Sequence, residues 1–331
     1  MHAPSMLRTT PAALLLLAAA CADPSTPLQP TGFDIPSLSS VISAGPGGVK
    51  PGLALWLRAD VGIGVADGAP VVRWRDQSGF GRDATLNAAN TYGELAPVFR
   101  ASNASLKSRP SVRFDGQQAL DLDLGFVVGR NYTVIAVNGR DRSGFANFWL
   151  AGDRASVNQS LILGYERTDL LRQSHFANDL DAVVENYTGT EIWSLDTYTF
   201  DQGSGRAIYH NGIPSATDNS VAVLTSTSGA NLGHFRAFPI YWFQGDLAEV
   251  IIYDRVLSSA ERLRVETQLA QRYGFSLQLE SYAPCAGPWT SHEEYVEAHR
   301  LVVLDFVDAR LLTRTEGQAA QAAAEASSCG S

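Results

Sequence analysis

The chain has 331 residues, of which 45% are hydrophobic and 18% charged, and its formal net charge is −9. This length exceeds one average domain and suits a single large all-β domain with small appendages. The negative balance excludes a nucleic-acid-binding surface, because such a surface needs a clustered excess of Lys and Arg.

The first twenty residues carry the pattern of an export signal. Arg8 precedes an apolar run over residues 12–20, and Cys21 follows that run directly. The run is too short to cross a bilayer, which takes about 20 apolar residues, and it is typical of a signal peptide over residues 1–20. Small residues before a cysteine resemble the bacterial lipobox, which implies that Cys21 is acylated and becomes the mature N-terminus. An ordinary signal peptide cleaved near Ala20 is the alternative.

Residues 21–51 are predicted to be a tether. From residue 22 to 51 the chain has six prolines and four glycines, and this composition cannot bury enough apolar surface to offset the entropy of ordering. As a flexible coil, the tether would hold the next domain about 30 Å from a membrane. Ala22, in place of Asp after Cys21, resembles the outer-membrane sorting pattern. We therefore expect a bacterial cell-envelope protein that meets the membrane through its lipid anchor only.

Residues 52–275 predict an antiparallel two-sheet sandwich. Short apolar, aromatic and β-branched runs alternate with Gly, Asn and Asp clusters, which is typical of many antiparallel strands. Both faces of residues 132–137 are apolar or β-branched, so this run is expected to be a central strand that is covered on both sides. The expected strands span residues 53–57, 71–74, 111–114, 132–137, 148–150, 160–163, 192–200, 206–210 and 247–253.

Three helices are predicted after the last strand. Gly274 supplies a stop for the first helix, which should span residues 259–273. The other two should form a small helical hairpin within residues 276–331. The expected capping boxes pair Ser258 with Glu261, Ser291 with Glu294, and Thr313 with Glu316.

The chain has three cysteines, Cys21, Cys285 and Cys329. If Cys21 carries lipid, the other two can pair in the oxidising compartment outside the cytoplasm. A disulfide between Cys285 and Cys329 would staple the helical hairpin, whose own core is small, and would contribute about 4 kcal/mol in the chain-entropy model.

Three stretches between residues 53 and 274 stand out together. They are residues 55–60 with residues 74–86, residues 109–116, and residues 245–258 with the helix that follows. In order and spacing they resemble bacterial laminin-G-like sandwiches of the concanavalin A-like superfamily. The resemblance implies an all-β jelly-roll sandwich, to which the small C-terminal α-helical hairpin is appended. It implies little about function, because this superfamily hosts many functions.

The loop over residues 76–83 is a candidate calcium site. Asp76, Ser78 and Asp83 offer oxygen donors, and two glycines let the backbone curl around an ion. No EF-hand pattern accompanies them. A tight turn held by Asp and Gly is the alternative interpretation, and no other cofactor is expected.

An aromatic segment bounded by glycines is the candidate ligand site. Aromatic rings can cover the apolar face of a sugar, while nearby amides and carboxylates bind its hydroxyl groups. Packing of most of these rings in the sandwich core is the alternative. The candidate residues are Asn231, His234, Phe238, Tyr241 and Trp242.

No catalytic constellation is expected. His292 and Glu293 lack the second histidine of a zincin helix, and the Glu-x-Asp-x-x-Glu run of laminarinase-type enzymes does not occur. Asp246 and Glu249 are three residues apart on one predicted strand, which places them on opposite faces.

These patterns predict a non-catalytic envelope lipoprotein that binds carbohydrate or another extracellular polymer. A structural or adhesin-like protein-binding role is the second expectation, and a glycoside hydrolase is the third. An exposed aromatic groove would favour sugar, whereas a large apolar patch would favour protein.

Overall fold

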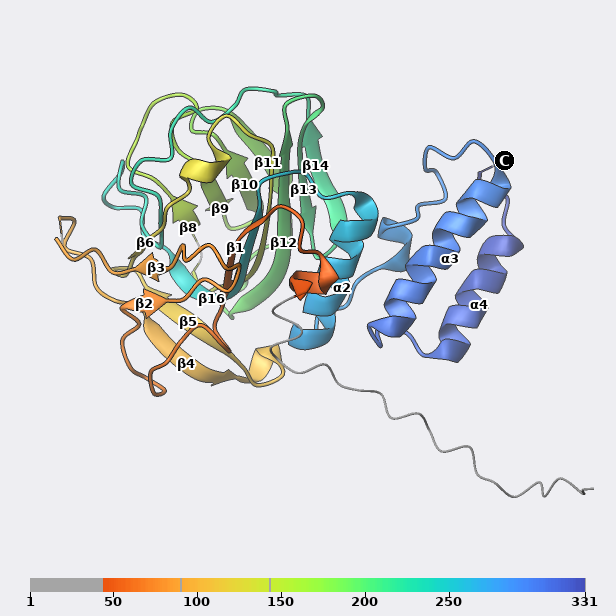
Figure 1. Ribbon diagram of the computed structural model, residues 1–331, viewed down its shortest axis with the longest axis horizontal. Helices are drawn as coiled ribbons and strands as arrows, with labels where there is room; N and C mark the ends of the chain where they lie inside the picture. The colour runs from red at the N-terminus through yellow and green to blue at the C-terminus, as the bar shows by residue number, and fades with distance from the viewer. Residues whose placement is uncertain (1–43, 90, 143, 331) are drawn as a thin grey trace, which may run out of the picture. The chain divides into compact units, whose positions relative to one another are not determined.

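The computed structural model describes residues 44–89, 91–142 and 144–330. The predicted signal peptide, Cys21 and most of the tether lie outside these residues. Within the described part of the chain, no helix is long and apolar enough to cross a membrane. The same residues form two antiparallel β-sheets, here called A and B, followed by α-helices (Figure 1).

The strands of sheet A are β1 (Leu53–Arg58), β4 (Val98–Asn103), β5 (Arg109–Asp115), β7 (Tyr132–Arg140), β12 (Ile192–Asp201), β13 (Gly205–His210), β14 (Ile213–Asp218) and β16 (Gln244–Tyr253). Their order is β14-β13-β12-β7-β16-β5-β4. β5 pairs with the N-terminal part of β16, and β1 pairs with the C-terminal part of β16. β5 and β1 therefore lie one after the other along the same side of β16.

The strands of sheet B are β2 (Arg73–Trp74), β3 (Ala84–Thr85), β6 (Leu120–Asp121), β8 (Asn147–Ala151), β9 (Ile162–Arg167), β10 (Leu170–Ser174), β11 (Asp179–Val183) and β15 (Asn231–Leu232). Their order is β11-β10-β9-β8-β15-β6-β3-β2. Short 3-10 helices, η1 to η4, occupy Pro46–Gly48, Ala104–Leu106, Gly125–Val127 and Leu279–Ser281.

The main hydrophobic core lies between the two sheets. Along β7, Tyr132, Val134 and Ala136 point into this core. Ile135 and Val137 point the other way and pack against α2 (Ser259–Tyr273). Every residue of β7 is buried, which confirms the predicted central strand. A helix, rather than a third sheet, covers the outer face of sheet A.

A β-bulge in β16 corrects the predicted orientation of two carboxylates. The register with β7 shifts between Leu247 and Glu249, and both Leu247 and Val250 point into the main core. The extra residue therefore brings Asp246 and Glu249 to the same, outer face of sheet A. The prediction that they lie on opposite faces was wrong, because simple alternation does not hold across a bulge.

The helices are α2, α3 (His292–Asp308) and α4 (Arg314–Glu325). α2 has the predicted bounds, the Ser258–Glu261 capping box and a left-handed Gly274. The N-caps of α3 and α4 are also as predicted, but the Glu294 carboxylate bonds to Thr290 instead of closing a box with Ser291.

A disulfide joins Cys285 to Cys329, with the two Cα atoms 4.8 Å apart. The predicted pairing is therefore confirmed. The predicted fold class, an antiparallel two-sheet sandwich followed by a small set of helices, is confirmed as well.

Candidate functional site

A pocket of about 260 Å³ lies on the outer face of sheet B. Leu163, Leu171 and Leu180 point into the core between the sheets. The residues that alternate with them along β9, β10 and β11 therefore point outward. The pocket is lined by six aromatic rings, three charged side chains and three other residues. These are Phe145, Phe148, Phe176, Phe235, Phe238 and Tyr241; Glu166, Arg172 and Asp179; and Ile162, Ser174 and Ala177.

A tight loop over residues 233–243 forms one wall of this aromatic pocket. Its two arms are tied by hydrogen bonds from Phe243 N to Gly233 O, 2.8 Å, and from Phe235 N to Tyr241 O, 2.9 Å. Gly233 has φ +108°, and a Cβ there would lie 2.3 Å from the carbonyl oxygen of Gln118. Only glycine fits at the base of the loop, and this fixes the position of the rings above it.

The rings contact one another in a continuous series. The ring centroids of Phe145 and Tyr241 are 5.5 Å apart, those of Tyr241 and Phe238 are 5.6 Å apart, and those of Phe238 and Phe176 are 6.2 Å apart. Phe235 and Phe148 are buried beneath them. Phe145 and Phe238 remain 50% and 38% exposed, so this part of the series is open to a ligand.

The opposite wall is a strained turn between β10 and β11. A hydrogen bond from His175 N to Asn178 O, 3.1 Å, closes the turn around Phe176 and Ala177. Both central residues have positive φ, +48° and +53°, a conformation that favours Asn-Gly. Left-handed backbone costs about 1–2 kcal/mol for each such residue. This conformation places the Phe176 ring in the wall of the pocket.

Charged groups border the rings. Arg172 donates from Nη1 to Glu166, 2.8 Å, and from Nε and Nη2 to the two oxygens of Asp181, 2.8 Å each. Asp179 lies 3.5 Å from the same Nη1 and accepts a hydrogen bond from Ser174. Burial raises the pKa of Glu166. Among the residues that line the pocket, the carboxylates of Glu166 and Asp179 outnumber the guanidinium group of Arg172, so this part of the lining is acidic.

Of the five residues predicted for the ligand site, two line the aromatic pocket and three lie outside it. Phe238 and Tyr241 line the aromatic pocket. His234 and Asn231 are buried, and the His234 ring stacks on the half-buried Trp242. Asn231 accepts from the backbone of His234 and donates to the Gly229 carbonyl oxygen. These three residues hold the loop in place and do not reach the pocket.

Sequence reasoning missed the other wall, including Phe176, Arg172 and Glu166. Between residues 160 and 183 the alternating signal is short and is confined to residues 179–182, where Asp179 and Asp181 point outward and Leu180 and Ala182 point into the core. Only residues 160–163 of that region were predicted to be a strand. The Phe176-Ala177 turn also lacks the Gly or Asn that marks most hairpins.

In the candidate calcium loop, the carboxylates of Asp76 and Asp83 accept hydrogen bonds from other groups of the protein. Asp76 accepts from the backbone amides of Trp56, Ser78 and Arg82 and from the Ser78 hydroxyl. Asp83 accepts from the Asp76 amide and pairs with Arg73. The described residues contain no group of three or more His, Cys, Asp or Glu that could hold a metal ion. The contacts support a tight turn and give calcium no support.

A larger polar pocket of about 680 Å³ lies between strands β3 and β6 of sheet B and residues 226–230. Asp83, Asp121, Asp123 and Arg236 line it with several hydroxyl groups, and none of its described lining residues is aromatic. It offers no aromatic ring on which a sugar could stack, so the aromatic pocket is the better candidate.

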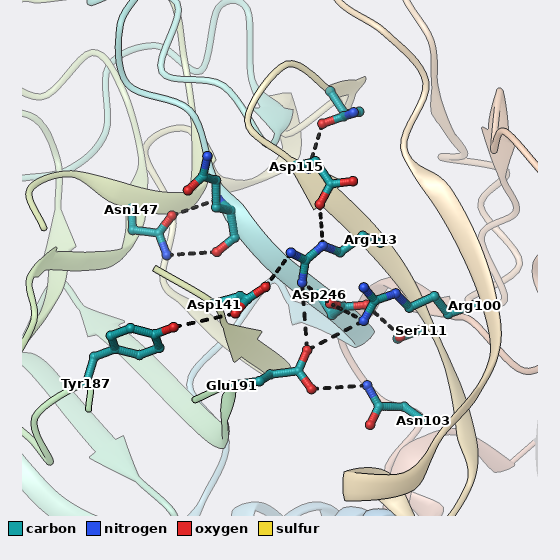
Figure 2. A network of polar contacts seen from close by, with 12 residues as sticks. Arg100, Asn103, Ser111, Arg113, Asp115, Asp141, Asn147, Tyr187, Glu191 and Asp246 are labelled. Carbon is teal, nitrogen blue, oxygen red and sulfur yellow. Dashed lines mark hydrogen bonds and ion pairs between the residues drawn. The ribbon is translucent and has the colours of Figure 1, made fainter. Parts of the chain in front are cut away.

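A network of charged groups holds the edge of sheet A together (Figure 2). Arg113 donates to Asp115, Asp141 and Asp246, and Arg100 lies 3.3 Å from Asp246. Burial raises the pKa of Asp246 to about 6, although the hydrogen bond from Arg113 opposes the shift. Arg113 and Arg100 already have carboxylate partners within this network, so neither is a candidate for binding an anionic ligand.

The structure is similar to several solved carbohydrate-active proteins. A Trypanosoma rangeli sialidase in complex with 2,3-difluoro-KDN matches with 18% identity and a TM-score of 0.46, over 66% of this chain and 33% of the sialidase. Domain 4 of a GH43 arabinanase from Geobacillus stearothermophilus, in complex with arabinotriose, matches with 17% identity and a TM-score of 0.40, over 53% of this chain and 81% of that domain.

The CBM40 of Ruminococcus gnavus IT-sialidase, bound to α2,6-sialyllactose, matches with 17% identity and a TM-score of 0.38, over 45% of this chain and 92% of that module. This chain spans about a third of the length of the sialidase. No family model matches the sequence, and no curated protein does. The fold assignment accordingly rests on the strand order and the core described above.

Proposed function

We propose that this protein binds carbohydrate and that its sugar site is the aromatic pocket on the outer face of sheet B. The observation that carries the proposal is a single pocket in which six aromatic rings meet three charged side chains. A flat ring can cover the apolar face of a pyranose, and carboxylate oxygens accept hydrogen bonds from its hydroxyl groups. The strained turn that presents Phe176 adds support, because such strain is typical of functional sites.

A glycan array probed with the full chain tests the proposal, followed by calorimetry on the Tyr241→Ala variant. We expect binding to at least one glycan class and a loss of about tenfold in affinity when the Tyr241 ring is removed. Phe80→Ala is the matched control, since Phe80 is 64% exposed and lies outside the pocket. An array without binding would overturn the proposal, and wild-type affinity in Tyr241→Ala would assign the sugar to another surface.

We propose further that the binding is non-catalytic. A glycoside hydrolase places two carboxyl groups on either side of the scissile bond. Glu166 and Asp179 both approach Nη1 of Arg172, at 2.8 and 3.5 Å, so each carboxylate already faces a cation rather than a substrate. Incubation with the bound glycans, followed by mass spectrometry, should recover them intact. Shortened products would show hydrolysis.

We also propose that the chain is an envelope lipoprotein and that its sandwich belongs to the laminin-G-like branch of the concanavalin A-like superfamily. The support is the apolar run before Cys21 and the order of the three sequence stretches described above. Mass spectrometry of the mature N-terminus should find a lipid-modified Cys21. An unmodified Ala22 at the N-terminus would contradict acylation.

A further inference from the structure

We infer that the aromatic pocket selects sugars that carry a free ammonium group over neutral and acidic sugars. The inference rests on the proposed function and specifies the class of ligand. Two separate features of the pocket point to a cation: its exposed aromatic rings, and a lining in which the carboxylates of Glu166 and Asp179 outnumber the guanidinium group of Arg172.

The aromatic rings provide the first feature. The face of an aromatic ring carries partial negative charge and attracts a cation within about 6 Å of the ring centroid. Phe145 and Phe238 are 50% and 38% exposed, and Tyr241 lies between them, in contact with both. Phe176 stacks on Phe238 with an interplanar angle of 13°. An ammonium group that enters the pocket would therefore lie among several of these rings.

The charged border provides the second feature. All three guanidinium nitrogens of Arg172 donate to carboxylates, Nη1 to Glu166 and the other two to Asp181. Three of the five N–H donors of Arg172 are thus taken by carboxylates, and Asp179 lies 3.5 Å from Nη1, which carries a fourth, so an acidic sugar would compete with carboxylates already in place. Glu166 and Asp179 line the pocket as acceptors, and Ser174 already donates its hydroxyl proton to Asp179.

Acceptors and aromatic faces together favour a ligand that donates hydrogen bonds and carries positive charge. A glucosamine unit does both, because its amino group is protonated at mildly acidic pH. N-acetylation removes that charge while leaving the hydroxyl groups, and a uronic acid brings a negative charge toward Glu166 and Asp179. These three sugars therefore separate charge recognition from ring stacking.

The test is calorimetric titration of the full chain at mildly acidic pH with tetramers of glucosamine, N-acetylglucosamine and galacturonic acid. We expect the glucosamine tetramer to bind about tenfold more tightly than the N-acetylated tetramer, and the galacturonate tetramer to bind most weakly. The preference should shrink as salt is added, because salt screens exposed charges.

Variants of the pocket carboxylates test which side chains cause the preference for the glucosamine tetramer. Glu166→Gln should reduce affinity for the glucosamine tetramer about fivefold more than it reduces affinity for the N-acetylated tetramer. Asp179→Asn is the second variant, since Asp179 is exposed and its replacement disturbs the fold less. Glu297→Gln, an exposed carboxylate on α3, is the matched control.

Equal affinity for the glucosamine and N-acetylated tetramers would overturn the inference and leave carbohydrate binding intact. A preference that survives in both pocket variants would also overturn it. If none of the tetramers binds and the glycan array is empty as well, carbohydrate binding itself is wrong.

Discussion

The imidazole of His234 stacks on the indole of Trp242, with ring centroids 3.5 Å apart and planes 8° apart. Nδ1 of His234 lies 2.9 Å from Glu94, whose other oxygen pairs with Arg236. Burial would raise the pKa of Glu94, but the hydrogen bonds from His234 and Arg236 outweigh it and lower the pKa. The stack thus anchors both arms of the 233–243 loop to a buried ionic group, away from the aromatic pocket.

Trp242→Ala should therefore reduce stability more than sugar binding. Removing the half-buried ring exposes His234 and loosens the loop, and we expect a loss of about 2 kcal/mol in the free energy of unfolding. Denaturant titration measures the loss. Affinity for the best ligand on the array, measured well below the melting temperature, should change less than threefold. A tenfold loss of affinity at unchanged stability would place Trp242 in the binding site.

Phe238→Ala should behave in the opposite way. Its ring is 38% exposed at the tip of the loop and lines the pocket, so its removal takes away ligand contacts and little of the core. We expect affinity to fall about tenfold and the melting temperature to fall by only a few degrees. Ile240→Ala on the same loop is the control, because Ile240 is 74% exposed and does not line the pocket. Equal effects of the two changes would contradict a specific role for the ring.

Local signals explain which elements could be predicted. The bounds of α2 follow from Ser258, Glu261 and Gly274, all of which act within the helix itself or next to it. The aromatic loop was visible because its rings are adjacent in sequence. The pocket was not, because it forms only when that loop meets β9, β10 and β11, and strand pairing between distant segments has no local signature.

Two further differences have specific causes. The bulge in β16 turns Asp246 and Glu249 to one face, and no glycine or proline marks Ala248 as its site. β10 and β11 mix Leu with Arg, Gln and Asp, and that composition hides strands whose polar side chains line a pocket. Their turn then uses Phe176 and Ala177, against the usual preference for Asn and Gly.

Ala177→Gly should stabilise the protein. Ala177 has φ +53°, and glycine adopts this conformation without the steric cost that alanine bears. Part of the gain is lost to the greater freedom of glycine in the unfolded chain, so we expect a net increase of about 0.5–1 kcal/mol in the free energy of unfolding. Denaturant titration measures it, and Ala309→Gly at the end of α3, where the backbone is right-handed, should be destabilising. A destabilised Ala177→Gly would mean that the turn is not strained.

The disulfide should stabilise the C-terminal hairpin and leave the sandwich unaffected. Only Gly317 and Ala324 of α4 are buried, so this helix has little apolar surface to hold it on α3. Replacing Cys285 and Cys329 with Ser should raise hydrogen exchange in α3 and α4, consistent with a loss of up to about 4 kcal/mol there. Protection in β7 and β16 should stay at the wild-type level. An equal loss of protection in those strands would show that the hairpin and the sandwich unfold together.

His210 predicts how stability depends on pH. Its Nδ1 lies 2.7 Å from Asp196 and its Nε2 lies 2.6 Å from Glu185, so carboxylates face both ring nitrogens. Burial would lower the pKa of His210, but the two carboxylates outweigh it and raise the pKa to about 10. Arg140 is the cation beside this group, with Nη2 3.6 Å from Glu185.

Because the folded protein holds this proton more tightly than the unfolded chain, whose histidine pKa is 6.5, the contribution is stabilising. It is fully present below pH 6.5 and is lost as the pH rises from 6.5 to about 10. The free energies of unfolding of the wild type and of His210→Gln, measured by denaturant titration over this range, should therefore converge as the pH rises. The wild type should be more stable than the variant by the largest amount at the acidic end of the range. A gap between wild type and His210→Gln that widens with rising pH would show that His210 is neutral in the folded protein.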